Sequence, residues 1–187
     1  MARVRLRVWE NNPSLQLPAG DASLPFLRVV ATVLLGLDPP PGEVVHRYDA
    51  TAAIDTGAPF SIIKCGTWEL YERLGLLERL GVPNGAALLN IAGSQCGYEL
   101  GRVWVGVADA DFRSRPQLPV LPAVPVIFQL LTTPNDDLEH PIILGLSGGF
   151  FDNRWFSRDP VAPRHALPRH DSGPRHGQEW YLRDEPA

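Results

Sequence analysis

Glycine and proline are the residues that most constrain how this chain folds. There are 17 glycines and 19 prolines among 187 residues, about a fifth of the chain, where about 12% is usual. Proline removes a backbone hydrogen-bond donor and interrupts helices, and both residues mark turns. The sequence therefore predicts short strands joined by turns, with little helix.

Length and charge exclude several classes of protein. A chain of 20.6 kDa buries enough surface to form one domain without metal or disulfide staples, and two cysteines make no disulfide framework. A net charge of −4 offers no basic face for nucleic acid. The charged start lacks the apolar run of a signal peptide, and no apolar stretch has the length of a membrane span. We expect a soluble, cytoplasmic protein with no nucleic-acid or membrane partner.

Apolar and alternating runs predict the strands, and one segment predicts a helix. The helix is expected to begin at Thr67, a suitable N-cap residue, with Glu69 and Glu72 near its positive end. The chain is expected to be mainly β, with one domain over 1–158. The predicted strands cover 4–9, 26–35, 44–54, 60–63, 87–92, 98–107, 124–131 and 141–144.

The composition changes at residue 159. Three Pro-Arg-His tripeptides occupy 163–165, 168–170 and 174–176 in a stretch with few apolar residues. Such a composition predicts a flexible C-terminal tail over 159–187, outside the core. The spacing of the three histidines matches no zinc-binding pattern, so no metal site is predicted.

One short motif indicates chemistry. Asp55 follows an apolar run and precedes Thr56 and Gly57. A strand end fixes the carboxylate, the hydroxyl can bond to a neighbouring strand, and glycine lets backbone or substrate approach closely. By composition alone, Asp-Thr-Gly occurs in about 4 of 100 such chains. Its meaning therefore depends on its context.

Three further segments supply that context. The apolar run at 60–63 follows the motif, a predicted hairpin with a glycine at each end of its tip spans 87–107, and Ile-Ile-Leu-Gly occupies 142–145. In this order and spacing, the four segments resemble the retropepsin family, the retroviral-type aspartic proteases, over residues 26–156. The segment 148–152 looks like that of bacterial members. The resemblance implies a closed β-barrel with a flap hairpin and one or two short helices.

The resemblance also implies a role for each segment. Asp55 is the catalytic residue of an aspartic endopeptidase that needs no cofactor. The loop around it is supported by Thr56, Gly57 and Ala58. The flap that covers the substrate comprises Ala92, Gly93, Ser94, Gln95, Cys96 and Gly97. The residues that pack under the site are Ile143, Leu144 and Gly145. Cys65 and Cys96 are expected to be small thiols, buried or partly exposed.

The implied mechanism requires a second carboxylate, because two acids share one proton. Asp171 begins an Asp-Ser-Gly sequence, but no apolar strand precedes it and no apolar-apolar-Gly segment follows it. The second carboxylate is instead expected to be Asp55 of a partner subunit. The prediction is a homodimer that cleaves a peptide or protein substrate at one site on its two-fold axis.

Two departures from the viral pattern leave alternatives open. Viral members often carry an aspartate and an arginine, which pair and support the dimer and the bound peptide, where this chain has Pro59 and Leu146. The alternative function is a catalytically weak dimer of the same fold that acts as a peptide or protein binding module. A third possibility is an unrelated, monomeric β-barrel with a chance Asp-Thr-Gly motif.

Overall fold

The computed structural model describes residues 3–16, 23–36, 48–83, 87–91, 93–135, 138–152, 154–160 and 178–184. Over these residues the chain is mainly β with one short helix, as the sequence predicts. The elements are β1 (Arg3–Arg5), β2 (Arg7–Gln16), β3 (Ser23–Gly36), β4 (Tyr48–Ile54), β5 (Ser61–Ile63), α1 (Thr67–Arg73), β6 (Glu78–Gly81), β7 (Leu88–Ile91), β8 (Ser94–Ala108), β9 (Val120–Leu131), β10 (Ile142–Leu144), β11 (Arg154–Pro160) and β12 (Gln178–Asp184).

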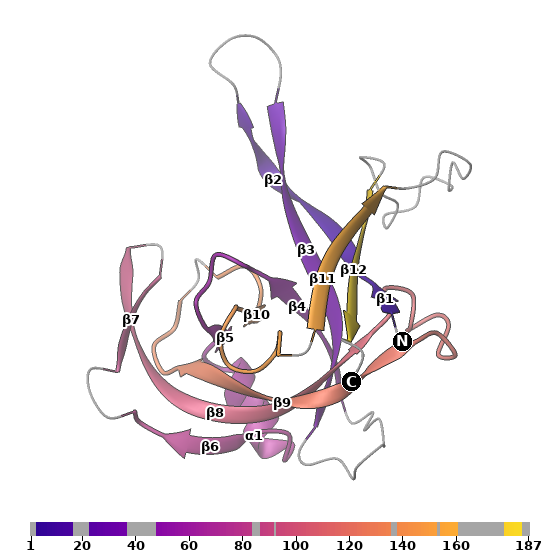
Figure 1. Ribbon diagram of the computed structural model, residues 1–187. Helices are drawn as coiled ribbons and strands as arrows, with labels where there is room; N and C mark the ends of the chain where they lie inside the picture. The colour runs from indigo at the N-terminus through magenta and orange to yellow at the C-terminus, as the bar shows by residue number, and fades with distance from the viewer. Residues whose placement is uncertain are drawn as a thin grey trace.

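The larger sheet closes on itself. Its strand order is β2-β3-β4-β10-β5-β9-β8-β6, and β3 pairs with β8 as well as with its two neighbours. The six strands from β3 to β8 in that order therefore form a ring, in which the long strands β8 and β9 curve beneath β4, β5 and β10 (Figure 1). Outside the ring, β2 and the first part of β3 extend as a two-stranded ribbon (Figure 1).

Strand β10 lies between two strands that are consecutive in the chain. It runs parallel to β4, with Ile143 opposite Ala53, and antiparallel to β5, with Ile143 opposite Ile62. β5 and β10 are each three buried residues long, and the last three residues of β4, Ala52, Ala53 and Ile54, are also buried. This arrangement brings the loops that follow β4 and β10 to the same end of the sheet.

The main core fills the ring. Buried side chains from β1, β3, β4, β5, β8, β9, β10 and β12 form it with those of α1, and its largest fully buried members are Phe128, Phe150 and Leu35. Helix α1 packs Trp68 and Tyr71 into this core, and the Trp68 indole donates a 2.7 Å hydrogen bond to the Leu131 carbonyl. Burial raises the pKa of Tyr71 to about 12.

The helix begins at Thr67, as predicted, but Thr67 is not its N-cap residue. Gly66, with a φ of 79°, occupies the N-cap position, and no side chain caps the helix. Thr67 is the first helical residue instead. The left-handed backbone at Gly66 turns the chain into the helix, a conformation that threonine avoids. Among the described residues, no helix is long and apolar enough to cross a membrane.

The C-terminal segment 178–184 forms a strand that packs against the rest of the fold. Strand β12 lies between β1 and β11 in a second, three-stranded sheet, and β11 itself continues to Pro160. Leu182 of β12 is fully buried in the main core and pairs with Val4 and Phe156. Residues 178–184 therefore belong to the domain, while the three Pro-Arg-His repeats lie outside the described residues.

Candidate functional site

Asp55 stands at the end of β4, on the rim of the ring. Its amide donates to the Leu144 carbonyl at 3.0 Å, which continues the pairing of β4 with β10 by one residue. Its carbonyl accepts from the Ala58 amide at 3.1 Å and closes a tight turn. Asp55, Thr56 and Gly57 are all exposed. A buried strand thus ends in a turn that presents a carboxylate to solvent.

The Asp55 side chain is held by its own turn. The Gly57 amide donates a 2.9 Å hydrogen bond to Oδ1, and a Cβ on Gly57 would lie 3.2 Å from that oxygen. Among the described residues, Gly57 is the only donor to this carboxylate. The turn therefore fixes Oδ1 and leaves Oδ2 for an interaction with water or a bound molecule.

The loop after β10 is bonded to the Asp55 loop. The Leu146 amide donates to the Ala58 carbonyl at 3.0 Å, and the Ser147 amide donates to the Pro59 carbonyl at 2.8 Å. The Gly145 amide donates to the buried Ser61 hydroxyl at 3.1 Å. These bonds hold the two loops as one unit, so Ile143, Leu144 and Gly145 lie directly against the segment that carries Asp55.

The predicted flap is a hairpin, but its tip differs from the prediction. Strand β7 pairs with β8, with Leu88 opposite Gly97 and Ile91 opposite Ser94. Residues 94–97 are therefore part of a strand and not of a five-residue tip. Gly93 lies in the turn between the two strands, and Ala92 lies outside the described residues.

The short turn has a local cause. Gly93 has a φ of 89°, and its amide donates to the Asn90 side chain at 3.1 Å. Glycine takes this left-handed conformation readily, and an asparagine side chain that accepts from a nearby amide stabilises a tight turn. The first of the two predicted tip glycines thus makes the turn, whereas Gly97 lies within β8, opposite Leu88.

A small apolar cluster connects the hairpin to the Asp55 loop. Its buried members come from β5, β8, β9, β10 and the loop before β10, and partly buried side chains pack around them. Ala58 contributes from the Asp55 loop, and Leu89 and Ile91 contribute from β7. The buried members are Ile62, Cys96, Leu131, Leu138 and Ile143. The surface beside the carboxylate is therefore apolar.

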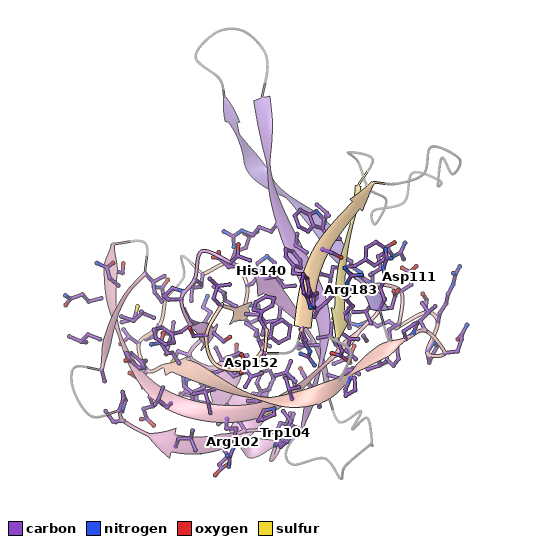
Figure 2. All side chains as sticks on the ribbon, viewed as in Figure 1. Arg102, Trp104, Asp111, His140, Asp152 and Arg183 are labelled. Atoms are coloured by element: carbon purple, nitrogen blue, oxygen red, sulfur yellow. The ribbon has the colours of Figure 1, made fainter. Side chains whose placement is uncertain are left out.

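Residues 132–135 belong to this region although the sequence analysis assigned them no role. Thr132, Thr133 and Asn135 each hydrogen-bond to Cys96 or Gly97 of β8. The only sequence indication was a polar loop between two apolar strands. That loop also carries His140, just before β10 (Figure 2), which is buried and whose pKa is lowered first by burial and also by Arg28. Glu139 opposes this effect.

The site offers no metal ligands among the described residues, where no group of three or more His, Cys, Asp or Glu side chains is placed to hold an ion. The histidines of the Pro-Arg-His repeats lie outside those residues. Both cysteines are free thiols, Cys65 partly exposed and Cys96 buried.

Comparison with protein-family models, with curated proteins and with solved structures finds no match to this chain. The resemblance to the retropepsin family therefore rests on the sequence motifs.

Proposed function

We propose that this chain is an aspartic endopeptidase of the retropepsin type, with Asp55 as its catalytic residue. The observation that carries the proposal is the exposed Asp55 carboxylate, held at the end of a buried strand by a loop that is bonded to a second, glycine-containing loop. A carboxylate that is held by rigid elements and open to solvent suits acid–base catalysis, because the group must keep a fixed position relative to the substrate.

A second copy of the chain supplies the second carboxylate. In the described part of the chain no other acidic side chain bonds to Asp55 or to the Gly57 amide that holds it. The two bonded loops also expose apolar side chains, Phe60 by 47% and Leu146 by 54%. Exposed apolar residues around a functional group mark surfaces that a partner covers. A two-fold axis near Asp55 brings two such loops and two carboxylates together.

The paired carboxylates activate water. Two acids in contact cannot both ionise, so they share one proton. The ionised carboxylate removes a proton from water, whose oxygen attacks the scissile carbonyl carbon, while the protonated carboxyl donates its proton to the carbonyl oxygen. The tetrahedral intermediate then collapses: a proton passes to the nitrogen, the C–N bond breaks, and the products are a carboxylic acid and an amine.

The apolar cluster indicates the substrate class. Ala58, Leu89 and Ile91 are only partly buried and lie between the Asp55 loop and the hairpin. Apolar side chains of a peptide would extend this cluster on binding, because burying apolar area is favourable. The proposed substrate is therefore an extended peptide segment with apolar residues around the scissile bond.

The alternative is a binding module with the same fold and little catalysis. Pro59 and Leu146 favour it, because these exposed apolar positions replace the charged pair that the family resemblance associates with peptide and dimer support. Such a protein would bind peptides and dimerise without cleaving them.

Substitution of Asp55 separates the two functions. Wild type, Asp55→Asn and Asp49→Asn are incubated with casein between pH 4 and 7. Asp49 is an exposed acid at the other end of β4, paired with Arg113 at 2.5 Å, and serves as the matched control. We expect fragments with wild type and with Asp49→Asn, and none with Asp55→Asn. Equal cleavage by Asp55→Asn would exclude the proposed role, whereas peptide binding without cleavage by all three proteins supports the binding module.

A further inference from the structure

The hairpin β7–β8 extends from the ring at one point along β8. From Tyr98 onward, β8 pairs with β9 in the ring, whereas from Gly97 outward it pairs with β7, which has no other strand partner among the described elements. Figure 1 shows β8 curving away from β9 at this end to meet β7. The strand therefore passes from one sheet to another at Cys96 and Gly97.

Three hydrogen bonds hold that crossing point to the loop after β9. The Thr132 amide donates to the Gly97 carbonyl at 2.9 Å, and the Gly97 amide donates to the Thr133 hydroxyl at 3.2 Å. The Asn135 side-chain amide donates to the Cys96 sulfur at 3.1 Å. Beyond these residues, Ser94 and Gln95 are exposed. We call residues 132–135 with Cys96 and Gly97 the clasp.

The buried part of the clasp is Asn135, 4% exposed, and Cys96, 1% exposed, although both carry polar atoms. A Cβ on Gly97 would lie 2.7 Å from the Thr132 side-chain oxygen, so a larger residue there would displace the Thr132 side chain. A buried asparagine amide must be hydrogen-bonded to offset its lost hydration. The bond to Cys96 therefore has an energetic role at this point of the hairpin.

Cys96 is not part of a disulfide in the structure, because both cysteines are free thiols. The thiol serves instead as an apolar anchor in the cluster and as the acceptor for Asn135.

We propose that Asn135 and Thr133 are positioning residues, which hold the hairpin against the Asp55 region and make Cys96 and Gly97 the hinge about which it opens. The inference rests on the proposed function where it gives the hairpin a substrate to cover. Leu89 and Ile91 pack on the apolar cluster when the hairpin is closed, and opening at the hinge removes them and uncovers Cys96. Release of the clasp thus weakens substrate retention without altering Asp55.

The reactivity of the Cys96 thiol measures this opening without any substrate. A buried group reacts at a rate set by the equilibrium that exposes it. In a Cys65→Ser background, which leaves Cys96 as the single thiol, iodoacetamide labelling is followed for the parent, Asn135→Ala and Thr133→Val. Loss of one net hydrogen bond corresponds to roughly a three- to tenfold increase in the open population. We expect increases of that size for both variants.

A core variant distinguishes hinge opening from general loosening. Val126→Ala removes buried packing from the main core, away from the clasp. Each variant's labelling rate is compared with its urea midpoint. If Val126→Ala accelerates labelling as much as Asn135→Ala at equal loss of stability, or if neither clasp variant accelerates it, the hinge is excluded.

Peptide kinetics provide the second readout. With an active enzyme, the clasp variants are expected to raise KM about three- to tenfold while kcat stays within about twofold, because only binding under the hairpin is affected. A fall in kcat at unchanged KM would contradict the positioning role. If no variant, the parent included, cleaves peptide, the proposed function fails while the labelling result still decides the hinge.

Discussion

Gly145 lies against the backbone of Phe60, so that a Cβ on Gly145 would be 2.3 Å from the Phe60 carbonyl oxygen and 2.8 Å from that of Ala58. These oxygens belong to rigid main chain and not to a flexible side chain. The residue that ends the Ile-Ile-Leu-Gly segment is therefore the point at which the two loops of the site touch, and only glycine fits between them.

Gly145→Ala is expected to lower the free energy of unfolding by about 2–3 kcal/mol, because an added methyl group in a packed site forces the backbone apart. Urea unfolding followed by tryptophan fluorescence measures the loss. Val82→Ala, at a position exposed by 63% outside the site loops, is the control and should change stability by less than about 0.5 kcal/mol. Equal stability of Gly145→Ala and wild type would show that the loops separate easily.

Self-association is expected to depend on Phe60 and Leu146. Replacing both by serine removes exposed apolar area from the Asp55 face and should raise the dimer dissociation constant about tenfold or more, measured by sedimentation velocity. Val82→Ser, at a position exposed by 63% away from the site loops, is the matched control and should leave association unchanged. A monomeric wild type, or an equal effect of the control, would contradict the proposed interface.

The strands that the sequence predicted best are those with long apolar runs. Residues 26–35 and 124–131 lie within β3 and β9, and the apolar residues at 142–144 form β10. Burial on both faces explains this success, because such strands carry a continuous apolar pattern. The same pattern located the end of β4 at Ile54 and hence the position of Asp55.

Strand β6 was missed because no apolar pattern defines it. Glu78, Arg79 and Leu80 are exposed, and the strand is held by pairing with β8 and by ion pairs across it. Glu78 accepts from Arg102, which is labelled on the lower side of β8 in Figure 2, and Glu99 accepts from Arg79. Such partners are separated by about 20 residues or more, so a local pattern cannot reveal them.

The clasp and strand β12 were missed for the same reason at longer range. Asn135 meets Cys96 from 39 positions away, and nothing local marks either residue. Leu182 follows a Pro-rich stretch, and its partners Val4 and Phe156 lie in distant parts of the chain. Composition gave no indication of the strand after it, in which Trp180, Tyr181 and Leu182 are flanked by polar and charged residues.

Arg154 connects β12 to the main domain, and its replacement should lower the free energy of unfolding. Its side chain is 1% exposed, donates to the carbonyls of Phe150, Val105 and Pro122, and lies 3.5 Å from the Asp184 carboxylate. Burial lowers the pKa of the guanidinium, and Asp184 opposes that effect. The charge is therefore retained by its partners.

Arg154→Met is expected to destabilise the protein by about 3 kcal/mol, because it leaves three carbonyls and one carboxylate without their donor. Arg113→Met is the matched control, since Arg113 is more than half exposed and pairs with the exposed Asp49; its effect should stay below about 1 kcal/mol. Both are measured by urea unfolding at pH 7. If the two variants lose equal stability, Arg154 does not hold β12 in place.

The protein should lose stability as the pH falls, because the buried His140 side chain is then protonated on unfolding. Burial is the main cause that lowers the pKa of this imidazole, with Arg28 acting in the same direction and Glu139 against it. The folded state thus favours neutral His140, while the unfolded state binds a proton near pH 6.5. The stabilisation is complete above that value and is lost progressively as the pH falls below it.

Glutamine cannot be protonated in this range, so His140→Gln should reduce the dependence of the free energy of unfolding on pH. Urea unfolding of both proteins between pH 8 and 5 is expected to show wild type losing more stability than the variant, at up to about 1.4 kcal/mol per pH unit for a single proton. The difference between the two curves is the decisive quantity, because other acidic groups contribute equally to both. Parallel curves over this range would show that protonation of His140 is not coupled to unfolding.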